Sequence, residues 1–173
     1  MQCLTPDQCS QWLHARSIFE SPDDHRDVSQ TSFCIAFAPP KEGSRLTAFT
    51  RWLFEAFGEF PGGLVVFTDW GLYRPDEMAV MESLRRGHGE QRRLIDAPGH
   101  LFEATEKDEA IGHCYLAVIF HWTAYLYLAS GAVTLLFWEG DLIDVWNPSK
   151  TMSPAIEEVV RKFELPVAAR GDG

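Results

Sequence analysis

The last third of the chain places the strongest constraint on the fold, because it contains three apolar segments of strand length. The segments read TAYLYLA, AVTLLFW and DLIDVW, and they are separated by Ser130-Gly131 and by Glu139-Gly140. Short apolar runs that are joined by glycine-containing turns are typical of antiparallel hairpins. In the last segment Leu142, Asp144 and Trp146 alternate with Ile143, Val145 and Asn147, as expected for a strand with one partly wet face. We therefore predict a three-stranded antiparallel meander.

Two further apolar runs lie upstream of this meander. They are SFCIAFA at 32–38 and LVVFT at 64–68, and the residues between them have the spacing of an amphipathic helix that Ser44 would cap. Nearly continuous apolar runs are typical of strands that are buried on both faces. This strand–helix–strand unit predicts a parallel pair of strands with a right-handed crossover.

Helix signals complete the pattern. Thr5-Pro6-Asp7 predicts the start of a first helix, Pro75 begins another, and Ser153-Pro154 begins the last. The segment from Thr105 to about Trp122 predicts a helix that is apolar nearly all round and therefore buried. The resulting fold class is α/β of the mixed α+β kind, with one sheet of about five strands that is covered by helices.

Length and composition indicate one cytoplasmic domain. With 173 residues, the chain fits a single globular domain over 1–173, and we expect the tail at 166–173 to be frayed. We find no signal peptide and no apolar run of the roughly 18 residues that a membrane span needs. The four cysteines lack the spacing of a zinc site, so no metal and no cofactor is expected.

The charge balance restricts the class of partner. The chain has 15 basic and 25 acidic residues, which gives a formal net charge of −10. This charge argues against nucleic acid and anionic membranes, since phosphate contacts need a basic surface. It favours association with a protein that has a basic surface. The alternative is that the acidity only keeps the protein in solution.

Catalytic motifs are mostly absent from the sequence. There is no G-x-S-x-G, H-E-x-x-H, phosphate-loop or dinucleotide-binding pattern, which lowers the expectation of an enzyme. His113 and His121 fall in the same predicted helix, eight residues apart, so they cannot chelate one metal ion by themselves. We expect each of them to be hydrogen-bonded at the edge of the core.

The segment FTDWGLYRPDEM at 67–78 is the first candidate binding site. It follows a predicted buried strand, and in open α/β sheets ligands bind beyond the carboxyl ends of the strands. Its candidate residues are Asp69, Trp70, Tyr73 and Arg74. The alternative is a structural corner, in which Asp69 accepts hydrogen bonds from its own turn and the aromatic side chains cover the end of the sheet.

Two other groups of residues are candidate binding surfaces. A basic island in the acidic chain suits an anion or an acidic partner, and it consists of Arg85, Arg86, Arg92 and Arg93. A patch on the meander suits the docking of a basic protein, and it consists of Trp138, Asp141, Asp144 and Trp146. The alternatives are a solvated helix end for the island and a charge-protected sheet edge for the patch.

These features favour a non-catalytic cytosolic binding protein, for which an acidic inhibitor of the immunity-protein type is one concrete form. Two alternatives remain open. One is a small hydrolase that would use Asp69, His100 and Asp96 in a cleft over the sheet. The other is a structural homodimer in which the tryptophan-rich meander is buried between the two chains.

Overall fold

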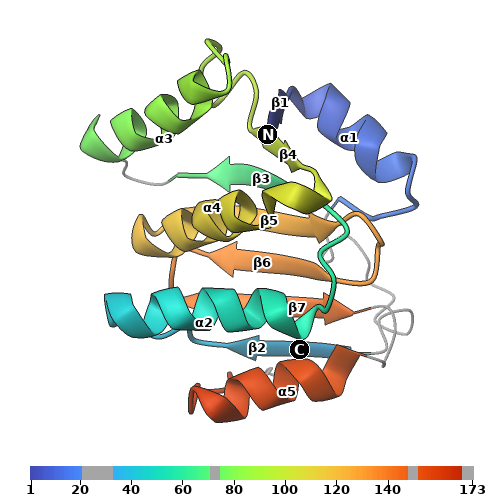
Figure 1. Cartoon of the computed structure of the whole chain (residues 1–173), viewed down its shortest axis with the longest axis vertical. Helices are drawn as coiled ribbons and strands as arrows, with labels where there is room; N and C mark the ends of the chain where they lie inside the picture. Colours follow the sequence, from blue (N-terminus) through green and yellow to red (C-terminus); the bar gives the residue numbers. More distant parts are fainter. Residues whose placement is uncertain (21–32, 71–74, 148–151, 169–173) are drawn as a thin grey trace.

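The computed structural model describes residues 1–20, 33–70, 75–147 and 152–168. Within these ranges the chain forms five α-helices, a 3-10 turn and seven strands (Figure 1). In chain order these are β1 (Gln2–Leu4), α1 (Pro6–His14), β2 (Phe33–Phe37), α2 (Gly43–Ala56), β3 (Gly63–Asp69), α3 (Pro75–Gly87), β4 (Gly99–Phe102), η3 (Ala104–Glu106), α4 (Lys107–Ile119), β5 (Thr123–Leu128), β6 (Thr134–Trp138), β7 (Leu142–Asn147) and α5 (Ser153–Lys162).

All seven strands belong to one sheet with the order β1-β4-β3-β5-β6-β7-β2. Every pairing in this sheet is antiparallel. The predicted meander is confirmed as β5-β6-β7, in which Leu126 pairs with Leu135, and Leu135 with Val145. The mixed α+β class is therefore confirmed, with seven strands in place of about five.

The predicted parallel pair is wrong. β2 lies at one edge of the sheet and pairs with β7, whereas β3 lies inside the sheet between β4 and β5. An apolar strand that is buried on both faces does not specify its neighbours, so the pairing depends on contacts that are distant in sequence. The sheet also gains two strands that were not predicted, β1 and β4, which pair with each other.

The two faces of the sheet are covered unequally. Helices α2, α4 and α5 lie across one face, which we call the three-helix face (Figure 1). The opposite face, which we call the α1 face, carries alternate residues of the strands, such as Leu64 and Tyr127. Among the described helices, α1 alone contributes buried side chains to the cluster on this face, through Cys9 and Leu13. The α1 face is consequently only partly covered by helices.

The helix boundaries agree with the predicted starts apart from details. Thr5 caps α1 as predicted, in a capping box. The Thr5 hydroxyl oxygen accepts a hydrogen bond from the backbone N–H of Gln8, and the Gln8 side-chain oxygen accepts one from the backbone N–H of Thr5. Helix α2 begins at Gly43 with Glu42 at its N-cap, two residues before the expected cap, so Ser44 is not the cap. Along the described residues, none of the helices has the length and apolar character that crossing a membrane requires.

Candidate functional site

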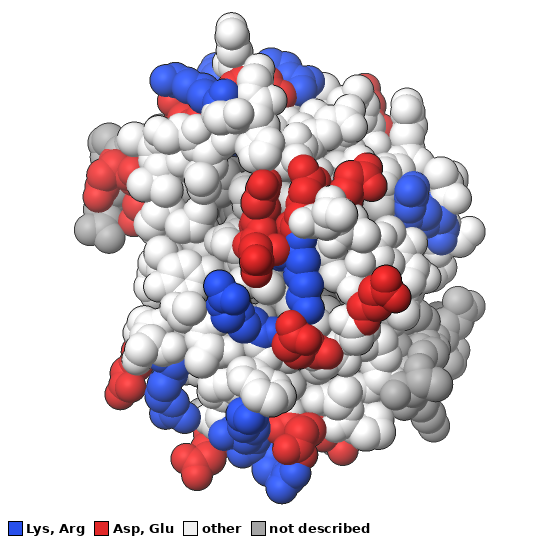
Figure 2. Space-filling view, viewed as in Figure 1, with Lys and Arg blue, Asp and Glu red and all other residues white. Residues whose placement is uncertain are grey.

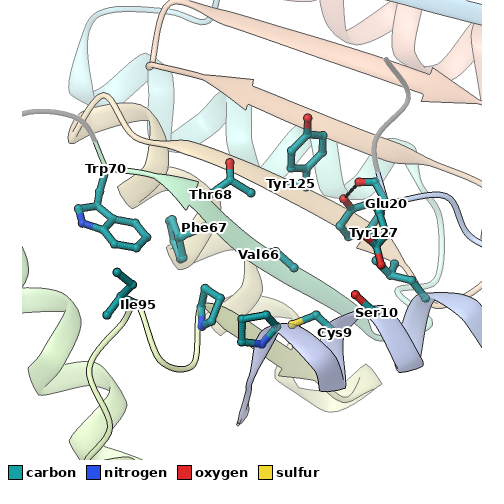
Figure 3. A pocket seen from close by; sticks show the side chains of 13 residues that line it. Cys9, Ser10, Glu20, Val66, Phe67, Thr68, Trp70, Ile95, Tyr125 and Tyr127 are labelled. Atoms are coloured by element: carbon teal, nitrogen blue, oxygen red, sulfur yellow. Dashed lines mark hydrogen bonds between the residues drawn. The ribbon is translucent and has the colours of Figure 1, made fainter. Parts of the chain in front are cut away.

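A cleft of about 560 Å³ lies on the α1 face, between helix α1 and the paired strands β3 and β5. Thirteen residues line it (Figure 3). Its large aromatic members come from three places: Phe67 from β3, Trp70 from the end of that strand, and two tyrosines, Tyr125 and Tyr127, from β5. A concave site with aromatic walls is the usual form of a binding site for a ligand or an anchoring side chain.

The two tyrosines form a flat aromatic surface in the cleft. Tyr125 and Tyr127 are two residues apart on β5, so their side chains leave the same face of the strand. Their rings are stacked, with centroids 5.6 Å apart and planes inclined by 11°. Opposite them in the register, Val66 pairs with Tyr125 and Leu64 with Tyr127, and Val66 adds an apolar side chain to the lining.

Helix α1 forms the second wall because a glycine lets it approach the sheet closely. A Cβ atom at Gly99 would lie 2.3 Å from the Sγ atom of Cys9 and 3.2 Å from the Cβ atom of Leu4. These distances are shorter than van der Waals contact, so the packing of α1 against β4 needs glycine at this position. The close approach places Cys9 and Ser10 of α1 along the cleft.

The cleft has an apolar end and an acidic end. Trp70 and Ile95 lie at one end, and Ile95 is 59% exposed (Figure 3). Glu20 lies at the other end, beside Tyr127 and Ser10 (Figure 3). The hydroxyl of Tyr127 donates a hydrogen bond to the backbone carbonyl oxygen of Glu20, which ties this part of the chain to the sheet.

The ionisable groups of the cleft do not form a nucleophile–base pair. Burial, together with the nearby charge of Glu20, raises the pKa of the Cys9 thiol to about 11, so the thiol stays protonated at neutral pH. Burial also raises the pKa of Tyr127. The described residues of the lining include one carboxylate, that of Glu20, and no lysine, arginine or histidine. The cleft therefore offers aromatic surface and one negative charge.

The predicted corner at 67–78 contributes to this cleft. Trp70 lines it and so does the neighbouring Thr68, whereas Asp69 is exposed and pairs in the register with Thr123. The register shifts between Phe67 and Asp69, which marks an irregularity where β3 ends. Two candidates from this corner, Tyr73 and Arg74, lie outside the described residues. The reasoning from parallel strands was wrong, although the position it selected borders the cleft.

The arginines of the basic island contact their own chain. Arg85 is 1% exposed, and its guanidinium donates hydrogen bonds to the carbonyl oxygens of Ala97, Arg92 and Arg93, at 2.8, 3.1 and 3.3 Å. Burial lowers its pKa. The remaining three form ion pairs: Arg86 with Glu82, Arg92 with Glu90, and Arg93 with Asp96. Arg85 thus fastens the segment that leads into β4.

The three residues of the hydrolase alternative lie in separate surroundings. His100 is fully buried and meets the ring of Phe67 at a centroid distance of 5.4 Å. Asp96 is exposed and accepts two hydrogen bonds from Arg93, which lower its pKa. His100 pairs with Val65, and Asp69 lies four residues farther along β3, or roughly 13 Å. The geometry does not bring the three side chains together.

A buried pair of histidines was not predicted from the sequence. The rings of His100 on β4 and His113 on α4 are 5.0 Å apart between centroids, and Phe102 is 4.9 Å from His113. Burial lowers the pKa of both imidazoles, that of His113 to about 4. The Nδ1 atom of His113 lies 2.9 Å from the carbonyl oxygen of Glu109. This hydrogen bond agrees with the expectation that His113 is hydrogen-bonded. No spacing in the sequence links these two positions.

The predicted meander patch is divided between different surroundings. Trp138 is 50% exposed, whereas Trp146 is buried. Asp141 forms an exposed ion pair with Lys41, and Asp144 lies between Leu136 and Ala36 in the register of neighbouring strands. These side chains do not form one continuous exposed surface.

Charges on the three-helix face are mixed. Acidic and basic side chains alternate across this face without a field of one sign (Figure 2). Two ion pairs link its helices: Lys107 with Glu55 at 2.7 Å, and Arg51 with Asp108 at 3.8 Å. This face therefore gives no sign of a partner of one particular charge.

Comparison of the chain with protein-family models, with curated proteins and with solved structures gives no match. The functional interpretation accordingly depends on the geometry of the cleft.

Proposed function

We propose that this chain is a non-catalytic binding protein and that its cleft receives a segment of another protein. The observation that carries the proposal is the joining of Trp70, Tyr125 and Tyr127 in one concave site of about 560 Å³. Tryptophan and tyrosine are the side chains that most often anchor protein interfaces, because they combine a large apolar area with a polar group.

The chemistry of the cleft supports binding over catalysis. The Cys9 thiol is protonated at neutral pH, since its pKa is raised to about 11, and no histidine in the lining could activate it. The ring of His100 packs against Phe67 and His113, and His100 does not line the cleft. A site without an activated nucleophile or a general base suits a partner that is held and not chemically changed.

The charge of the chain supports a basic partner. The formal net charge is −10, and among the described residues of the cleft lining the carboxylate of Glu20 is the one charged group. Such a field speeds association with a positively charged surface. An acidic inhibitor of the immunity-protein type remains the concrete form that we favour. We place it in the cytoplasm, for which the free thiols of Cys3, Cys9 and Cys114 give support.

Affinity capture with matched tryptophan variants tests this proposal. Tagged wild-type protein, Trp70→Ala, Tyr125→Ala and Trp52→Ala are used as baits in lysate of the source organism, and the bound proteins are quantified by mass spectrometry. Trp52 is a suitable control because it is 46% exposed on α2 and stacks on Lys162, away from the cleft. Thermal melts confirm that each bait is folded.

The proposal expects at least one partner that wild type and Trp52→Ala retain and that both cleft variants lose. If folded Trp70→Ala and Tyr125→Ala capture the same proteins in the same amounts as wild type, the cleft is not the binding site.

A further inference from the structure

The cleft changes in polarity along its length. The end at Trp70 and Ile95 is apolar (Figure 3). The other end presents the carboxylate of Glu20 and the hydroxyl of Ser10. A ligand that fills the cleft therefore contacts an apolar wall at one end and a negative charge at the other.

The negative charge at the acidic end is held in place. Tyr127 is buried, and its hydroxyl donates to the carbonyl oxygen of Glu20, which fixes the backbone from which the carboxylate extends. The partly exposed ring of Tyr125, which is stacked on Tyr127, adds the negative face of an aromatic system, which attracts ammonium and guanidinium groups. Both features favour a cation at this end.

Among the described residues that line the cleft, none is a lysine, arginine or histidine that could neutralise Glu20. Arg16 is the one lysine or arginine among residues 1–20, and it is engaged elsewhere. Its guanidinium lies 4.1 Å from the centroid of the Trp12 ring and donates to the Trp12 carbonyl oxygen at 3.3 Å. The acidic end is therefore complementary to a cation that comes from a partner.

The floor of the cleft limits how a partner segment can bind. β3 is an inner strand that pairs with β4 on one side and with β5 on the other. Its backbone groups are used in the ladders, so a partner cannot add a strand to it. Recognition must come from side chains that enter the cleft, and affinity then depends on which side chains the segment carries.

From these contacts we infer the sequence class of the segment that binds, an inference that rests on the function proposed above. The cleft selects an extended basic segment with two anchors. An apolar or aromatic side chain packs against Trp70 and Ile95, and a lysine or arginine farther along the segment pairs with Glu20 beside the tyrosine rings.

Selection from a displayed library of random heptapeptides tests this inference. The baits are wild type, Glu20→Gln, Tyr125→Ala and the control Glu59→Gln, which removes an exposed carboxylate on the chain after α2. Enriched peptides are synthesised and titrated by fluorescence anisotropy at two salt concentrations. Each peptide is also made with its lysine or arginine replaced by norleucine.

We expect enrichment of peptides that combine an apolar residue with a lysine or arginine. Glu20→Gln should weaken their binding about tenfold, while Glu59→Gln changes it less than twofold. The norleucine peptides should bind wild type and Glu20→Gln equally, because the pair that Glu20 forms is already absent.

Two outcomes would overturn the inference, and they differ in what they leave standing. Enriched peptides that lack a cation, lose binding with Tyr125→Ala and ignore Glu20→Gln would refute the basic anchor but keep the cleft as the binding site. Enriched peptides that bind Tyr125→Ala as tightly as wild type would refute both this inference and the proposed function.

Discussion

The rings of Tyr125 and Tyr127 are stacked on the α1 face, 5.6 Å apart between centroids, and line the cleft. Their spacing follows from the alternation of side chains along β5. Because Tyr127 is also tied to the backbone of Glu20, the same wall connects the aromatic surface to the acidic end of the cleft. Strand β5 thus links the aromatic surface of the cleft to its acidic end.

Arg85 should be essential to stability, in contrast to its neighbour in sequence. Arg85→Lys leaves at least one of the three carbonyl oxygens near Arg85 without a donor, and we expect a loss of about 3 kcal/mol in the free energy of unfolding. Arg86→Lys is the matched control, because Arg86 is exposed and pairs with Glu82 on the helix surface. Its change should stay within about 0.5 kcal/mol. Urea unfolding measures both, and equal values would contradict this role of Arg85.

Arg85 also shows where local sequence patterns reach their limit. An arginine near the carboxyl end of a helix is favourable to the helix dipole, so the sequence alone predicted a solvated residue or an anion site. Its burial results from the position of residues 92–97, which fold back over α3 and present their carbonyl oxygens to it. Nothing within the helix signals that contact.

Gly99 should tolerate no side chain. In Gly99→Ala the new methyl group would meet the Sγ atom of Cys9 at 2.3 Å, so helix α1 must shift away from β4. We expect a destabilisation of about 1 to 3 kcal/mol and a lower melting temperature. Gly87→Ala is the control, since a Cβ atom there meets nothing within 4 Å at the end of α3. A melting temperature of Gly99→Ala equal to that of wild type would disprove the tight contact.

The strands that were predicted and the strands that were missed differ in length and in context. The meander was predicted because its three segments are long and are separated by two glycine turns. β1 has three residues and β4 has four, and β4 begins at Gly99 in a segment rich in glycine and charge. Such short strands have too few residues for a periodicity to show. They form because β4 pairs with β3 and β1 pairs with β4.

Only part of the candidate site could be predicted from the sequence, for a related reason. Trp70 was identified because it follows an apolar run, and the run is β3 as predicted. Cys9 and Ser10 reach the cleft through the packing of α1 on Gly99, and Glu20 reaches it through the hydrogen bond of its backbone to Tyr127. Contacts of this kind are set by tertiary packing, which no local pattern in one sequence encodes.

Mild acid should destabilise the protein through His113. Its folded-state pKa is about 4 against 6.5 for an ordinary histidine, so below pH 6.5 the unfolded chain binds a proton that the folded chain does not. The contribution of His113 to the free energy of unfolding is fully present above pH 6.5. It falls by roughly 3 kcal/mol in total as the pH drops toward 4. His100, whose pKa is also lowered, acts in the same direction.

Urea unfolding at pH 7, 6 and 5 measures this dependence. His113→Phe should flatten the slope between pH 7 and 5, because the titrating group is gone and an aromatic ring still packs against Phe102. The exposed His14, replaced by asparagine, serves as the control and should keep the wild-type slope. A His113→Phe slope as steep as that of wild type would contradict the assignment.

The most direct test of the binding account is the affinity of a captured partner for matched variants, measured by isothermal titration calorimetry. If the cleft is the anchor site, Tyr125→Ala and Trp70→Ala should each weaken binding by about 2 kcal/mol, or about 30-fold, while Trp52→Ala changes it less than twofold. Cleft variants that remain folded and bind the partner as tightly as Trp52→Ala would contradict the account.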